Sequence, residues 1–89
     1  MSNAELGTAD EFLTEMEDIY ADLKQVRRSI RLGDVIAKDL GVDSLDALEM
    51  LVVLENTYGV TLVGNPQVAA VETVGDLHTL LGALTGARA

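Results

Sequence analysis

The chain has no cysteine and no tryptophan, and its 89 residues include one histidine, one proline and three aromatic side chains. Without cysteine it can form neither disulfides nor thiolate metal sites, and it suits a reducing compartment, so we expect a cytoplasmic protein. The sequence does not indicate a Ser-His-acid hydrolase. Ser44 lacks the neighbouring glycines of a nucleophile elbow, and the single histidine is His78, far from it in the sequence. We therefore expect no catalytic residues, no resident metal and no enzyme activity.

Positive charge is also scarce, because six Lys and Arg face fifteen Asp and Glu and leave a net charge of −9. Nucleic-acid binding needs clustered basic residues, so we expect no nucleic-acid partner. No stretch approaches the 18 or so apolar residues that span a bilayer, and Met1-Ser2-Asn3-Ala4-Glu5 is neither basic nor apolar, so we expect neither membrane insertion nor export. The acidity fits either a basic protein partner or the solubility of a chain that is 48% hydrophobic.

The first part of the chain is typical of a helix followed by a long connection. Thr8 and Glu11 match a capping box, which predicts a helix from residue 8 to about 25. Its apolar side chains repeat with a period of 3.6 and should face the core: Phe12, Met16, Ile19, Tyr20 and Leu23. Residues 26–43 form the connection, with a short helical turn expected over 34–39. Four of the six cationic side chains gather between residues 24 and 31: Lys24, Arg27, Arg28 and Arg31. They either place positive charge favourably at the C-terminus of the first helix, on a solvated face, or form a docking patch.

Three further helical segments follow. One is expected over 44–58, ended by Gly59, with an apolar arc so wide that it predicts burial on more than one side: Leu45, Leu48, Met50, Leu51, Val52, Leu54 and Tyr58. Asn65 and Pro66 predict a short third helix to about residue 70. The last helix opens at Thr73 and should bury Leu77, Leu80, Leu81 and Leu84.

These patterns predict an all-α four-helix bundle with a short third helix. We expect one domain over residues 8–84. Residues 1–7 would be a flexible N-terminus in which Ser2-Asn3-Ala4 resembles a tag-cleavage scar, and residues 85–89 a frayed tail.

The segment from Asp39 to Asp46 reads Asp-Leu-Gly-Val-Asp-Ser-Leu-Asp and places Ser44 at the start of the second long helix. A helix N-terminus presents free N–H groups and partial positive charge, which favours a phosphate ester on that serine. The plain alternative is that Ser44, or Asp43 beside it, is an N-cap. Like charges three or four residues apart destabilise a helix, so stability does not explain Glu49 and Glu55, and the pattern predicts an acidic docking face near Ser44.

Residues 39–59, the acid-poor loop after them and the segment 72–77 together resemble an acyl carrier protein, and the resemblance extends over about residues 8–84. It implies a stand-alone carrier in which Ser44 receives 4′-phosphopantetheine from coenzyme A through a phosphopantetheinyl transferase. Asp43 would help to hold the Mg²⁺ used in loading, and Leu45 and Val52 would lie beside the arm. The resemblance further implies docking of an acyltransferase, a ketosynthase or another acyl-processing enzyme through its basic surface to three carboxylates: Asp46, Glu49 and Glu55.

The function implied is to carry acyl thioesters as a monomer in polyketide or fatty acid biosynthesis. A specialised pathway such as polyketide synthesis fits at least as well as fatty acid synthesis, because residues 63–70 lack the acidic run usual in fatty-acid carriers and residues 56–57 are Asn and Thr. A peptidyl carrier is one alternative, although such carriers usually have glycine in place of Asp43. The other alternative is an unmodified acidic helical module that binds a basic partner.

We also expect a loaded acyl chain to be sheltered between the second long helix and its neighbours. The side chains expected to close over it are Leu62, Val63, Val68 and Val71.

Overall fold

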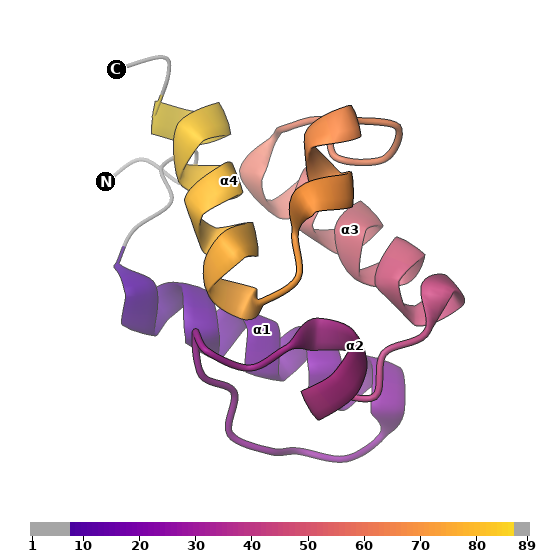
Figure 1. Ribbon diagram of the computed structural model, residues 1–89. Coiled ribbons are helices and arrows are strands. Elements are labelled where there is room, and N and C mark those ends of the chain that lie inside the picture. Colours follow the sequence, from indigo (N-terminus) through magenta and orange to yellow (C-terminus); the bar gives the residue numbers. More distant parts are fainter. Residues whose placement is uncertain (1–7, 87–89) are drawn as a thin grey trace.

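The computed structural model describes residues 8–86, which form helices throughout, apart from connections and one isolated β-bridge. The elements are α1 (Ala9–Lys24), α2 (Ile36–Asp39), α3 (Ser44–Tyr58), the 3₁₀ helix η1 (Pro66–Ala70) and α4 (Val74–Gly86), shown in Figure 1. The predicted fold class is confirmed: α1, α3 and α4 are the long helices, η1 is the short third one, and α2 is the expected helical turn. No helix among these residues combines the length and hydrophobicity needed to cross a bilayer. The predicted flexible N-terminus, residues 1–7, and residues 87–89 of the predicted tail lie outside the described residues.

The three long helices and η1 begin where nearby side chains bind their free backbone N–H groups. At α1, the Thr8 hydroxyl accepts from the Glu11 N–H and the Glu11 carboxylate accepts from the Thr8 N–H, which confirms the predicted capping box. At η1, the side-chain oxygen of Asn65 accepts from the Gln67 N–H, without a reciprocal bond. At α4, Thr73 accepts from the Asp76 N–H, and the Asp76 carboxylate accepts from the N–H of Thr73 and of its neighbour. These contacts span two to four residues, so they depend on local sequence alone.

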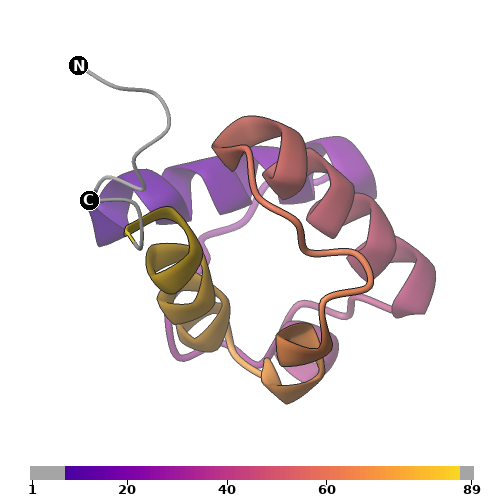
Figure 2. The same cartoon turned by 90° about the horizontal axis from the view of Figure 1, so that it is seen from above.

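The core lies between α1, α3, η1 and α4, which surround a common centre when the molecule is viewed from above (Figure 2). Apolar side chains fill this centre, and six of the large ones are fully buried: Phe12, Met16, Leu54, Leu62, Val74 and Leu81. The predicted buried stripe of α1 is confirmed except that Leu23 is only partly buried. On α4, three predicted leucines are buried and Leu84 is partly buried.

The outer face of α3 differs from the prediction. Met50, Leu54 and Tyr58 are buried, but the exposed fractions are 67% for Leu45, 45% for Leu48 and 42% for Val52. The prediction of burial on more than one side is therefore wrong for this stripe, which faces solvent.

Backbone hydrogen bonds tie the connection around α2 to the start of α4. Val35 and Thr73 form the isolated antiparallel bridge, and three N–H···O bonds in all link residues 32–36 with residues 72–75. Gly75 lies so close to residues 32–36 that a Cβ atom added to it would be 3.0 Å from the Leu32 carbonyl oxygen. The contacts fix α2 relative to the start of α4.

The last helix extends past residue 84, the predicted end of the domain. It continues to Gly86, and Thr85 is buried with its hydroxyl donating to the Leu81 carbonyl at 2.8 Å. That back-bond satisfies the buried hydroxyl, which explains how a polar residue extends the apolar face of α4.

Candidate functional site

Ser44 is the first residue of α3, and the preceding residue caps the helix. The Asp43 carboxylate accepts from the Asp46 N–H at 2.8 Å, so Asp43 rather than Ser44 is the N-cap. Ser44 is exposed. Its hydroxyl is thus not used by the cap, and it lies at the positive end of a 15-residue helix. This position can stabilise a phosphate ester through the helix dipole and the free N–H groups of the first turn.

A cavity of about 510 Å³ opens beside Ser44. Its floor consists of the buried side chains of Val42, Met50 and Leu77, and its exposed rim includes Ser44, Asp43 and Glu72. The remaining lining residues come from around α2, from α3 and from the segment that includes η1: Val35, Ile36, Ala37, Ala47, Leu51, Val68 and Val71. Since an apolar cavity of about 150 Å³ admits benzene, this one has room for an aliphatic chain.

The residues predicted to close over an acyl chain are divided between two places. Val68 and Val71 line the cavity, as does Leu51 of α3. Leu62 instead lies in the main core with no exposed surface, and Val63 is 42% exposed. The prediction for Leu62 and Val63 is therefore wrong, because the chain turns away from the cavity between Gly59 and η1.

Glu55 fixes that turn. One oxygen of its carboxylate accepts from the backbone N–H of both Leu62 and Val63, at 2.7 Å each. These bonds lower the pKa of Glu55, because they stabilise its charged form. The interpretation that stability does not explain Glu55 is wrong: its carboxylate holds the loop after α3.

This contact predicts different effects for two glutamates on the same helix. We expect Glu55→Gln to lower the Tm by several degrees at pH 7, because it replaces the charged acceptor of two N–H groups by a neutral amide oxygen. Glu49→Gln, on an exposed position, should leave the Tm unchanged or slightly raised in a chain of net charge −9. Because the folded pKa of Glu55 is lowered, its contribution is present above the unfolded pKa of about 4.3 and is lost as the pH falls through the folded value. In thermal melts from pH 7 to pH 3, the difference in Tm between Glu55→Gln and the wild type should decrease. Equal Tm values of Glu55→Gln and Glu49→Gln at pH 7 would contradict the structural role of Glu55.

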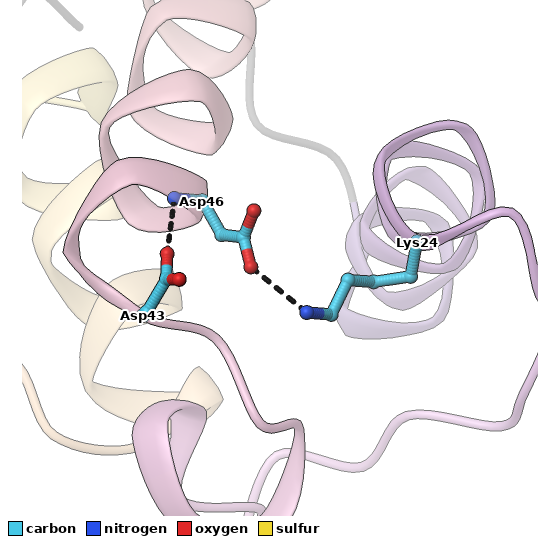
Figure 3. Close-up of polar contacts among 3 residues, drawn as sticks. All are labelled: Lys24, Asp43 and Asp46. Carbon is cyan, nitrogen blue, oxygen red and sulfur yellow. Dashed lines mark hydrogen bonds and ion pairs between the residues drawn. The ribbon is translucent and has the colours of Figure 1, made fainter.

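Asp46 also has a partner within the fold. Its carboxylate accepts from the Lys24 ammonium at 2.8 Å, so the end of α1 is joined to the first turn of α3, as Figure 3 shows. The two side chains are partly shielded, with exposed fractions of 30% for Lys24 and 18% for Asp46. Their hydrogen bond raises the pKa of Lys24 and lowers that of Asp46, because it favours both charged forms.

The other cations of the cluster between residues 24 and 31 mostly bind within the fold as well. Arg27 pairs with Asp18 at 2.9 Å, and Arg28 donates to the Asp39 carbonyl at 2.7 Å, beside the end of α2. Three of the four side chains are thereby committed to internal contacts, which favours the structural explanation of the cluster over a docking patch.

The remaining predicted site residues lie on the outer face of α3. Glu49 is exposed, and neither of the two ion pairs among residues 8–86 includes it. Leu45 and Val52 are exposed and do not line the cavity. Ser44 and Asp43 thus meet at the cavity rim, whereas Glu49, Leu45 and Val52 form the neighbouring outer surface.

His78 is half-buried on α4 and lies away from the lining of this cavity. Its ring packs against Phe12 with 5.0 Å between the centroids, and its Nε2 is buried without a hydrogen-bond partner among residues 8–86. It therefore belongs to the interface between α1 and α4 and not to the surroundings of Ser44.

Comparison with known families supports the importance of this region. The family model described as "Phosphopantetheine attachment site" matches residues 16–81, about three quarters of the chain. The matched region contains α2, α3, η1 and all the residues that line the cavity described above. No curated protein matches the chain.

Proposed function

The chain belongs to the phosphopantetheine attachment family, and from this premise we propose that Ser44 carries the arm in an acyl carrier protein of polyketide or fatty acid biosynthesis. The cofactor of the family is a covalent 4′-phosphopantetheine. Carrier domains of this kind are modified by a phosphopantetheinyl transferase, interact with acyl-processing enzymes and are in general not catalysts themselves.

One observation carries the proposal for Ser44. The hydroxyl is exposed, is left out of the helix cap by Asp43, and lies both at the N-terminus of α3 and at the mouth of an apolar cavity. The helix end suits the phosphate of the arm, and the cavity suits an aliphatic cargo. A capping serine on a closed surface would have neither the free hydroxyl nor the cavity.

The loading reaction requires little of the carrier beyond an accessible nucleophile. The Ser44 oxygen forms a bond to the phosphorus next to the pantetheine of coenzyme A and loses its proton. The pyrophosphate bond breaks, and adenosine 3′,5′-bisphosphate leaves. Asp43 uses one oxygen in the cap at 2.8 Å, and we propose that its exposed carboxylate also helps to hold the Mg²⁺ that the transferase uses.

When bound, the arm supplies a terminal thiol that carries the acyl group as a thioester. The chain's own residues then position and protect the cargo: the first turn of α3 stabilises the phosphate, and the apolar walls exclude water from an aliphatic chain. The tether raises the effective concentration of the cargo at a partner enzyme.

The peptidyl carrier alternative has less support. Asp43 stands where such carriers usually have glycine, and it serves here as the N-cap of α3. The cavity beside it is lined mainly by apolar side chains, which suit an acyl chain better than a polar aminoacyl group.

The test is to incubate the purified chain with coenzyme A, Mg²⁺ and a broad-specificity phosphopantetheinyl transferase, and to measure its intact mass. We expect complete conversion to a species heavier by one phosphopantetheinyl group, located by peptide mapping on the peptide that contains Ser44. An unchanged mass under conditions that load a control carrier would refute the proposal and favour the unmodified helical module.

A further inference from the structure

Part of the apolar arc of α3 is exposed beside Ser44. Leu45, Leu48 and Val52 recur at spacings of three and four residues, are 42–67% exposed, and form a stripe about 10 Å long on one side of the helix. An enzyme that makes a bond at the Ser44 oxygen must place its active site next to Leu45. The stripe therefore lies within the area that such an enzyme covers.

Two of the three carboxylates of α3, those of Asp46 and Glu55, are engaged in contacts within the fold and so add little negative charge to the surface around this stripe. Glu55 turns its carboxylate to the backbone of Leu62 and Val63. Asp46 is paired with Lys24 at 2.8 Å. Glu49 is exposed and belongs to neither ion pair found among residues 8–86.

Lys24 comes from a different helix and is 22 residues distant from Asp46 in the chain. Its side chain extends from the end of α1 to the first turn of α3, next to the cap formed by Asp43 (Figure 3). Because both side chains are partly shielded, the ammonium remains close to the carboxylate and cancels most of its field at the surface.

We propose that Lys24 is a specificity-determining residue: it compensates Asp46, reduces the negative charge beside the exposed Leu45, Leu48 and Val52, and so favours enzymes with apolar docking surfaces over strongly basic ones. This rests on the proposed loading of Ser44. The partner class that fits is an enzyme with a shallow apolar surface and few cations next to its active-site entrance.

The experiment compares Lys24→Met with Arg27→Met as substrates of a phosphopantetheinyl transferase whose docking surface is basic. Both variants change the net charge by one and break one ion pair, but the Arg27–Asp18 pair is 56–63% exposed and does not involve α3. At about 10 mM salt we expect roughly a threefold increase in kcat/KM for Lys24→Met, which disappears near 1 M salt as the Debye length shrinks to about 3 Å. Arg27→Met should stay near the wild type at both concentrations.

A double variant separates compensation from direct docking by Asp46. Asp46→Asn alone leaves the Lys24 charge uncompensated and should lower kcat/KM at low salt. If Lys24 acts by compensation, Lys24→Met combined with Asp46→Asn restores the wild-type value. If Asp46 itself binds the partner, the double variant stays as low as Asp46→Asn. This comparison remains decisive even where Lys24→Met alone does not fold.

An apolar variant completes the test. Leu48→Ala should lower kcat/KM severalfold at low and high salt alike, because it removes apolar contact area and no charge. Equal salt dependence of Lys24→Met and Arg27→Met, or a double variant that is not restored, overturns the role of Lys24 while leaving the proposed function intact. A wild-type chain that is not loaded at all overturns the proposed function instead.

Discussion

Ser44→Ala is expected to abolish loading by coenzyme A and the transferase while leaving the fold nearly unchanged. The hydroxyl is the proposed attachment atom, and alanine provides no nucleophile. The structural cost is small because Asp43, not Ser44, caps α3, and Ser44 is exposed. We expect a loss of stability well below the roughly 1 kcal/mol typical of a lost N-cap. Intact mass spectrometry measures the loading, and circular dichroism with a thermal melt measures the fold.

Two control variants make this result specific. Ser29→Ala changes another exposed serine and should load as the wild type does. Asp43→Ala should lower the Tm, because the Asp43 carboxylate accepts from the Asp46 N–H in the cap of α3. It should also lower the loading rate, because it removes the carboxylate proposed to help hold the Mg²⁺. A Ser44→Ala chain that loses most of its helical signal would show that Ser44 is structural, and one that still gains the arm would place the attachment elsewhere.

The second large effect is a rise in Tm with the length of the attached acyl chain. The cavity of about 510 Å³ beside Ser44 is lined by apolar side chains. An octanoyl chain has six methylenes more than an acetyl group, and each buried methylene is worth about 0.8 kcal/mol, so the upper limit is roughly 5 kcal/mol. Less than half of that, about 2 kcal/mol, would raise the Tm of a domain of this size by on the order of 10 °C.

The measurement is a thermal melt of the loaded protein with acetyl, butyryl, hexanoyl and octanoyl groups. Ala47→Leu fills part of the cavity from α3 and should remove most of the dependence on length. Ala83→Leu makes the same change at an exposed position of α4 that does not line the cavity, and should leave the dependence intact. Identical melting of the acetyl and octanoyl forms of the wild type would exclude shelter of the chain in this cavity.

The same structure changes how docking is best tested. Replacing Glu49 and Glu55 together by lysine, which the sequence alone suggests, would break the bonds from Glu55 to Leu62 and Val63 and disturb the fold. The pair Lys24 and Asp46, together with the exposed Leu48, tests the docking surface without moving that loop.

The sequence by itself determined the helices and their starting points. Thr8 with Glu11, Asn65 and Thr73 bind N–H groups two or three residues further along, so the signal and the structure it produces lie in the same short segment. Gly59 ends α3 in the left-handed conformation, with φ of 68°, for an equally local reason. The start of α3 at Ser44 follows from these rules as well, although the choice of Asp43 over Ser44 as the cap needed the structure.

The tertiary structure decided which neighbours cover each helix face and which partner each charged side chain binds. A 3.6-residue period shows that α3 is apolar on a wide arc, but it carries no information on which neighbours pack there, so the exposure of Leu45 and Leu48 was not predictable. The wall of the cavity around α2 depends on the bridge between Val35 and Thr73, which joins distant parts of the chain. Likewise, Asp46 looks like a free surface acid in the sequence, because the lysine that compensates it lies on another helix, 22 residues away.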